Sequence, residues 1–128
     1  MLNKKMILFV SALSLAAFAI AQNSLVELRA DMSGSGIASG KAKYKLKQRA
    51  GRQLQEEIEV EGEDLAPNST YTITLSGAPI GEATTDGFGS FEWSRRNLRT
   101  RGYQVQAGTP VGVEDANGPV MSGAFAPL

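Results

Sequence analysis

Hydrophobic and polar residues alternate in short runs along residues 22–128, and the alternation has a period of two. The first run, residues 26–32, places apolar side chains at even positions and charged ones at odd positions, and it ends in the glycine-rich residues 33–36. Successive side chains of a strand point to opposite faces of a sheet, so this run predicts a strand with one buried face followed by a turn.

Similar runs follow along the rest of the chain, and none of them has the spacing of an amphipathic helix. Turn signals separate them at Gly77-Ala78-Pro79, Asp86-Gly87-Phe88-Gly89 and Asn117-Gly118. The predicted strands cover residues 26–32, 41–49, 54–61, 70–75, 80–85, 91–93, 103–106, 111–113 and 120–126. Seven to nine short strands with turns between them predict an all-β fold, either an antiparallel β-sandwich or a small barrel.

Two neighbouring runs carry opposite charges at alternate positions. Residues 41–49 have a base at every odd position, and residues 57–63 have a glutamate at every odd position. If they form a hairpin, both apolar sets face one side when the numbers of paired residues add to 104 or to 102, and both registers set lysines opposite glutamates. The sum of 104 pairs Lys47 with Glu57 and Lys45 with Glu59. The alternative is that the bases bind an external anion.

The first 21 residues form a separate unit. Lys4 and Lys5 precede the apolar residues 7–20, which end at Ala19-Ile20-Ala21. This pattern predicts a secretory signal peptide, residues 1–21, cleaved before Gln22, because the apolar run is shorter than the roughly 20 residues that a membrane span needs. An uncleaved membrane anchor is the alternative. We therefore expect one exported all-β domain, residues 22–128, in the periplasm or secreted, with no integral membrane segment in the mature chain.

Charge and composition narrow the functions that this domain can have. The full chain has 13 basic and 13 acidic residues, and removal of Lys4 and Lys5 leaves the mature part mildly acidic. We expect no nucleic-acid partner, and an anionic surface could be bound only through a local patch. The chain lacks cysteine and histidine, so the usual thiol nucleophiles and proton shuttles are missing, and we expect no enzyme, no cofactor and no metal site. The alternative enzyme is a sugar-active one that uses carboxylates.

A local pattern resembles a known family of domains. The spacing Leu65-x-Pro67-x-x-x-Tyr71 is similar to the tyrosine corner of fibronectin type III and related immunoglobulin-like sandwiches. With the motif TTDGFGSFEW at residues 84–93, the chain resembles small exported bacterial immunoglobulin/fibronectin type III-like β-sandwich domains. The resemblance implies an immunoglobulin-like sandwich in which the Tyr71 hydroxyl bonds to the upstream backbone, and it implies no activity.

A second basic cluster is the candidate ligand site. Four arginines lie there between two aromatic residues, and guanidinium groups beside aromatic rings suit planar anions and sugars. The candidate residues are Trp93, Arg95, Arg96, Arg99, Arg101 and Tyr103. The alternative is a solvated loop with both aromatics in the core. We expect an exported, non-catalytic binding or structural module of the cell envelope or secreted fraction, with an anionic envelope polymer or a carbohydrate as ligand. A protease-inhibitor-like or adhesive module that presents a loop is a further alternative.

Overall fold

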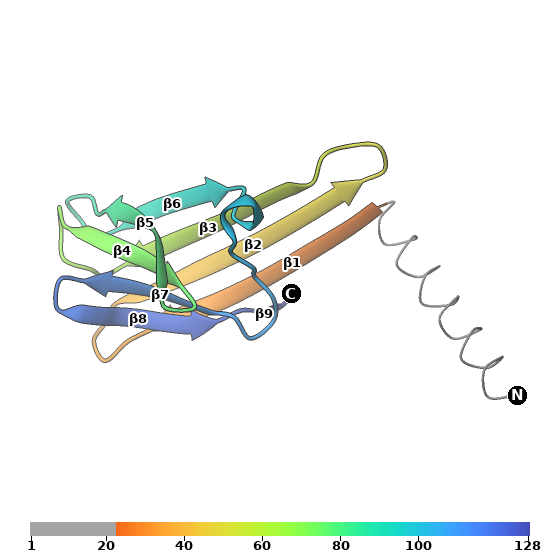
Figure 1. Ribbon diagram of the computed structural model, residues 1–128. Helices are drawn as coiled ribbons and strands as arrows, with labels where there is room; N and C mark the ends of the chain where they lie inside the picture. Colours follow the sequence, from red (N-terminus) through yellow and green to blue (C-terminus); the bar gives the residue numbers. More distant parts are fainter. Residues whose placement is uncertain (1–22) are drawn as a thin grey trace, which may run out of the picture.

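The computed structural model describes residues 23–128 and confirms an all-β fold (Figure 1). The predicted signal peptide lies outside the described residues. The strands are β1 (Asn23–Ser33), β2 (Ser39–Arg49), β3 (Gln55–Glu63), β4 (Thr70–Leu75), β5 (Ala78–Thr84), β6 (Phe91–Arg96), β7 (Pro110–Asp115), β8 (Gly118–Ala124) and β9 (Ala126–Pro127), with one 3₁₀ turn, η1 (Arg99–Arg101). Within residues 23–128, no helix has the length and apolarity needed to cross a bilayer.

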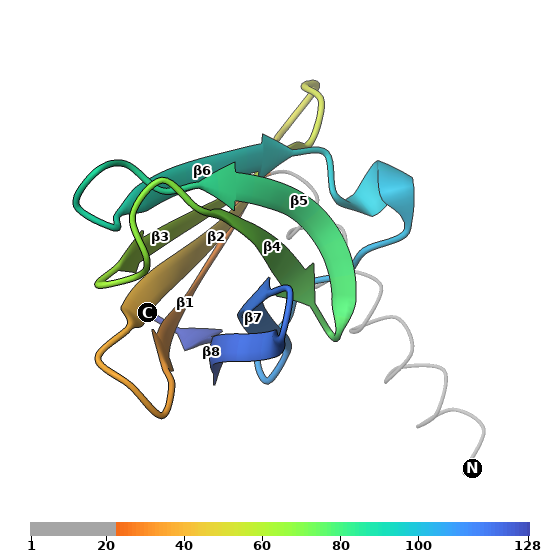
Figure 2. The ribbon, with the colours of Figure 1, turned by 90° about the vertical axis from the view of Figure 1, so that its left-hand side faces the viewer.

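All the strands belong to one antiparallel sheet that curls almost into a barrel. The strand order is β5-β4-β7-β8-β1-β2-β3-β6, and the short β9 pairs with β1. In the end-on view, the two outer strands of this order, β5 and β6, come close to each other (Figure 2). Of the two predicted architectures, the nearly closed barrel describes this sheet better than two separate layers.

Side chains bridge the seam between β5 and β6, where strand pairing is absent from the described sheet order. The Arg95 guanidinium donates to the Ile80 carbonyl, and the Tyr103 hydroxyl donates to the Pro79 carbonyl at 3.2 Å. The Trp93 ring lies directly against Gly81, where a side chain of any size would collide with it. Trp93, Arg95 and Tyr103 therefore hold the two sheet edges together.

The barrel interior is filled by the inward-facing side chains of these strands. The buried residues of β1, β2 and β3 are all even-numbered, as the alternation predicted. The largest side chains with almost no exposed surface are Tyr44, Ile58, Val60, Ile73, Leu75, Leu98, Val111, Val113, Met121 and Phe125. Leu98 comes from the loop after β6, so this loop closes one end of the barrel.

The two oppositely charged runs are antiparallel neighbours, as predicted, with the register whose residue numbers add to 102. This register sets Lys41 opposite Glu61, Lys43 opposite Glu59 and Lys45 opposite Glu57, while Lys47 lies opposite the neutral Gln55. On the other side of β2, Glu27 of β1 lies opposite Lys45 and Asp31 lies opposite Lys41. The lysines of β2 therefore lie between two partly acidic strands. Most of them face acids of the same sheet and not an external anion.

The junction before β4 has the hydrogen bond that the tyrosine-corner resemblance implied. The backbone N–H of Ala66 donates to the Tyr71 hydroxyl at 3.0 Å, and the Tyr71 ring is buried. The Thr85 hydroxyl donates to the Ala66 carbonyl at 2.6 Å, which ties the same junction to the end of β5. These two hydrogen bonds fix the position at which β4 begins.

The predicted strand at residues 103–106 is wrong. The structure has no strand there, because the backbone of this segment, which links η1 to β7, pairs with none of the strands of the described sheet. Tyr103 and Val105 are half-buried against the core while Gln104 and Gln106 are exposed. A strand-like alternation therefore arose from one-sided packing of an extended loop.

Candidate functional site

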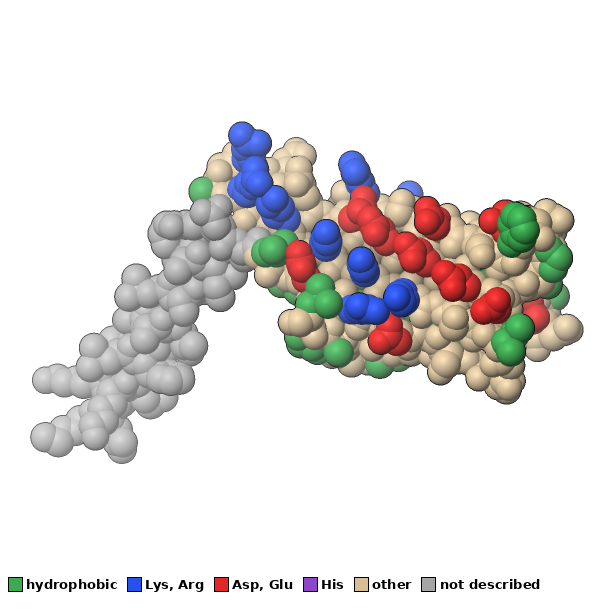
Figure 3. Space-filling view, turned by 180° about the vertical axis from the view of Figure 1, so that it is seen from behind, with side chains coloured by type: hydrophobic (Ala, Val, Ile, Leu, Met, Phe, Trp, Pro, Cys, Tyr) green, Lys and Arg blue, Asp and Glu red, His purple; other side chains and the backbone are tan. Residues whose placement is uncertain are grey.

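Charged side chains are segregated along the barrel axis (Figure 3). The end formed by the β2–β3 hairpin, the end of β6 and η1 carries most of the bases, and we call it the basic end. Its basic side chains are Lys45, Lys47, Arg49, Arg52, Arg96, Arg99 and Arg101. The opposite end, formed by the β3–β4, β5–β6 and β7–β8 connections, carries most of the acids, and we call it the acidic end. Its acidic side chains are Glu61, Glu63, Asp64, Asp86, Glu92, Glu114 and Asp115.

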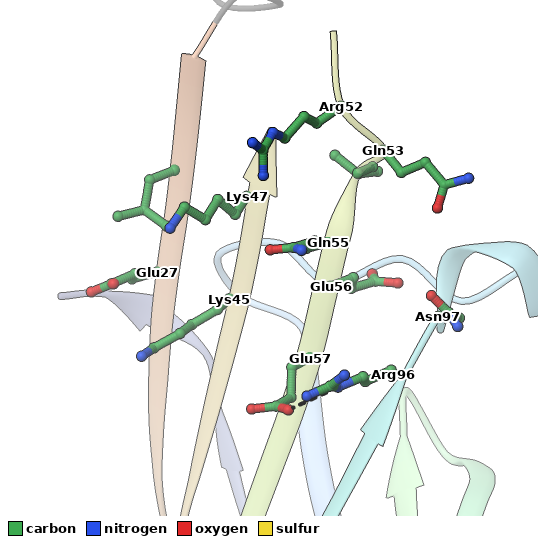
Figure 4. Close-up of a pocket in the computed structure, with 12 residues that line it drawn as sticks. Glu27, Lys45, Lys47, Arg52, Gln53, Gln55, Glu56, Glu57, Arg96 and Asn97 are labelled. Atoms are coloured by element: carbon green, nitrogen blue, oxygen red, sulfur yellow. Dashed lines mark hydrogen bonds and ion pairs between the residues drawn. The ribbon is translucent and has the colours of Figure 1, made fainter. Parts of the chain in front are cut away.

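A groove of about 730 Å³ crosses the strands at the basic end (Figure 4). Bases from two segments far apart in the sequence meet in it, since Lys45, Lys47 and Arg52 come from the β2–β3 hairpin and Arg96 comes from β6. The other lining residues are Leu25, Glu27, Gln53, Leu54, Gln55, Glu56, Glu57 and Asn97. Four cations, three amides and three glutamates line one hollow, and the cations that no acid neutralises suit a ligand with anionic oxygens.

The bases of the groove differ in how far nearby acids neutralise them. Lys45 lies between Glu27 and Glu57 in the sheet, and the Arg96 Nε is 3.3 Å from the Glu57 Oε2. Lys47 instead lies between Leu25 and Gln55. Lys47 therefore keeps its outward field, and this follows from the register that the hairpin adopts.

The carboxyl group of Glu56 is buried beneath this groove and positions η1. Its Oε2 accepts a hydrogen bond from the Tyr44 hydroxyl at 2.5 Å, and its Oε1 accepts one from the Arg99 backbone N–H at 2.9 Å. Burial, together with this bond to Glu56, raises the pKa of Tyr44 far above its ordinary value. In Figure 4, Glu56 points toward Asn97, away from Lys45 and Lys47. Glu56 thereby holds Arg99 and Arg101 at the basic end.

The structure divides the six predicted site residues into two groups. Arg96 lines the groove, and the exposed Arg99 and Arg101 lie on η1 at the same end of the barrel. Trp93, Arg95 and Tyr103 lie at the seam instead.

The surroundings of Trp93 also differ from those of the groove. Trp93 is half-buried, and it borders a shallow hollow of about 330 Å³ together with Glu59, Glu61 and Glu92. Three carboxylates around this hollow are the opposite of what an anionic ligand needs.

Sequence reasoning missed the contribution of the hairpin to the groove. In the register that adds to 104, Lys47 lies opposite Glu57, and Arg52 lies in the turn between the two charged runs. The signal that could have identified Lys47 was the second register, which leaves it opposite Gln55. The sequence also does not show the acidic neighbour of Arg96, because only the pairing of β6 with β3 brings Glu57 to it.

The acidic end has its own shallow groove of about 440 Å³, bordered by Glu61, Glu63, Asp86 and Glu92. Among residues 23–128, no group of three or more acidic side chains is arranged to hold a metal ion. Two apolar side chains project from loops at this end, Ile37 with 82% and Phe88 with 90% of its surface exposed. Asp86 fixes the Phe88 turn, since its Oδ1 accepts the N–H groups of Phe88 at 2.9 Å and Ser90 at 3.0 Å.

Two comparisons with known proteins find no relative of the chain. No model of a known protein family matches the sequence, and a search of curated proteins finds no match.

Proposed function

We propose that the protein is an exported, non-catalytic binding module of the cell envelope or secreted fraction, and that it binds an anionic polymer through the basic end. One observation carries this proposal: Lys47 and Arg52 of the hairpin meet Arg96 of β6 around one groove. The bond from Ala66 to Tyr71 supports a relation to immunoglobulin/fibronectin type III-like domains, which often serve as binding modules.

The groove supports an anionic ligand because several of its cations keep their field in water. Lys47 has neutral neighbours in the sheet, and Arg52 lies in an exposed turn. Arg99 and Arg101 add two exposed guanidinium groups close by. The field of such a cluster extends over a Debye length of about 8 Å at physiological salt, so binding should weaken as salt rises.

The carboxylates near the groove do not favour the sugar-active enzyme. Glu56 is buried, and both of its oxygens accept protein hydrogen bonds. Glu57 pairs with Arg96 on the outer face. Neither group is placed to donate a proton to a glycosidic oxygen while the other attacks or activates water. The exposed Phe88 turn is the feature that fits an adhesive module, but scattered exposed apolar side chains such as Ile37 and Phe88 are common on protein surfaces.

Retention on an immobilised acidic polysaccharide at low salt tests the proposal. Wild type should be retained, and Lys47→Gln/Arg52→Gln should elute at clearly lower salt. Arg99→Gln/Arg101→Gln should weaken retention in the same direction. The matched control is Lys41→Gln/Lys43→Gln, which removes the same charge from lysines that face glutamates. Equal loss in the control and the groove variant would mean that no local site exists.

A further inference from the structure

The basic end also carries exposed apolar side chains, which the binding of a hydrated polymer does not explain. Leu25, Val26 and Leu54 have 59%, 39% and 38% of their surfaces exposed, and Leu25 and Leu54 line the same groove as Lys47 and Arg52. Leu128 is 70% exposed, and its N–H donates to the Glu27 carbonyl of β1 at 3.4 Å. Leucines and bases therefore share one surface.

We propose that the basic end docks on the surface of an anionic phospholipid bilayer. Lys47, Arg52, Arg99 and Arg101 would lie at the level of the lipid phosphates, and Leu25 and Leu54 would enter the boundary between headgroups and acyl chains. The inference rests on one part of the proposed function, the binding of anionic groups by the basic end, and it names a lipid surface in place of a polymer as their source.

The mixed chemistry of this end favours a bilayer over a free polymer. A polyanion in water can attract the bases, but it offers little apolar surface to the leucines. Interfacial binding combines attraction to anionic lipid with burial of apolar side chains a few ångströms below the phosphates. The groove brings both types of side chain to one end of the barrel, which is the arrangement that a lipid interface needs.

The distribution of charge over the rest of the molecule supports the same orientation. The acidic end lies at the opposite end of the barrel axis, so an anionic surface repels that end while it attracts the basic end (Figure 3). The approach is therefore directed even though the mature chain carries slightly more acids than bases. The exposed Ile37 and Phe88 lie at the repelled end and would stay in water.

Vesicle co-sedimentation provides the test. The protein recovered after export is used, with its start verified by intact mass. The probes are vesicles of phosphatidylcholine alone and vesicles with equal amounts of phosphatidylcholine and phosphatidylglycerol. We expect binding to the second kind only, and loss of that binding in high salt and in Lys47→Gln/Arg52→Gln.

The leucines distinguish a bilayer from a polymer. Leu25→Ser/Leu54→Ser should weaken binding to the anionic vesicles by about tenfold or more. The reason is that each methylene buried in the interface adds to the free energy of membrane binding. Its retention on acidic polysaccharide should not change. The matched control is Ile37→Ser/Phe88→Ser, which removes exposed apolar side chains from the acidic end and should leave vesicle binding unchanged. Far-ultraviolet circular dichroism verifies that each variant is folded.

The outcomes separate the two proposals. If the leucine variant binds anionic vesicles as well as wild type, the docking surface is wrong. If wild type is retained on polysaccharide but binds neither kind of vesicle, the lipid proposal is wrong and the polymer-binding function stands. If wild type binds neither probe, both proposals are wrong.

Discussion

At the scale of single residues, Glu56 shows how far the sequence pattern could be followed. Glu56 opens a run of acids that suggested a solvated face, yet it is 5% exposed. Its even number places it on the inner face with Ile58 and Val60, so its direction could be predicted. Its partners could not, because Arg99 is 43 residues away along the chain and no local pattern links the two.

The Tyr44–Glu56 bond is expected to stabilise the fold. Tyr44→Phe removes the donor and leaves a buried carboxyl oxygen without it, so the free energy of unfolding should fall by about 1.5–3 kcal/mol. Urea titration measures this change. Tyr103→Phe is the matched control, because its hydroxyl bonds the Pro79 carbonyl at an exposed site and should contribute about 1 kcal/mol or less. Equal effects of the two substitutions would argue against a special role for Glu56.

The Asp86 turn predicts a dependence of stability on pH. The N–H groups of Ser90 and Phe88 bond the Asp86 carboxylate and lower its pKa, since they favour the charged form. A group with a lowered pKa stabilises the fold above its unfolded pKa, about 3.9, and this contribution disappears as the pH falls through the folded pKa. The stability difference between wild type and Asp86→Ala should therefore shrink in acid, as thermal unfolding at a series of pH values would show. A difference that is constant down to the acid limit would contradict this assignment.

At the scale of elements, the opposite charges at alternate positions of residues 41–49 and 57–63 identified the β2–β3 pair but left two registers open. Both registers bury the same apolar residues and pair lysines with glutamates, so alternation alone could not decide between them. The observed register places Glu56 opposite Leu46, where its carboxyl group reaches the Tyr44 hydroxyl. The choice therefore coincides with a buried contact that involves η1, which lies outside the hairpin.

A double-mutant cycle tests this register. Lys43→Glu and Glu59→Lys should each lower stability, and the double exchange should recover part of the loss, with a coupling of about 0.2–1 kcal/mol that shrinks in high salt. The cycle on Lys47 and Glu57 is the control, because these two residues are opposite only in the other register and Lys47 lies opposite Gln55 in the observed one. A larger coupling in the control cycle would mean that the hairpin is shifted by two residues.

At the scale of the whole molecule, the all-β class followed from alternation and turns, whereas the strand order did not. The order places β6 beside β3 and β7–β8 beside β4 and β1, and these neighbours are separated by long stretches of chain. The site depends on this order, since only the β3–β6 pairing brings Arg96 to the hairpin lysines. The sequence could thus identify Arg96, Arg99 and Arg101 as candidates, but it could not assemble them with Lys47 and Arg52.

The separation of bases and acids to opposite ends of the barrel predicts how the protein binds ion-exchange resins, which its near-zero net charge alone would not predict. At neutral pH and low ionic strength, a protein of residues 22–128 should be retained on both cation-exchange and anion-exchange resins, because each resin can contact one end. Lys47→Gln/Arg52→Gln should elute from the cation exchanger at lower salt and should not lose affinity for the anion exchanger. Gradient chromatography measures both changes. Failure of wild type to bind the cation exchanger would show that the basic end has too weak a field.

The contact between Leu128 and Glu27 has a practical consequence for engineering the chain. It places the carboxyl terminus beside β1, and the four residues from Glu27 back to Asn23 span roughly 13 Å of extended strand. A flexible peptide of about six to eight residues can cover such a distance, so Leu128 can be joined to Asn23 and the chain reopened in the exposed loop 34–37. In such a circular permutant both new ends would emerge beside the acidic end. Affinity tags and fluorophores could then be attached there without covering Leu25, Lys47 or Arg52.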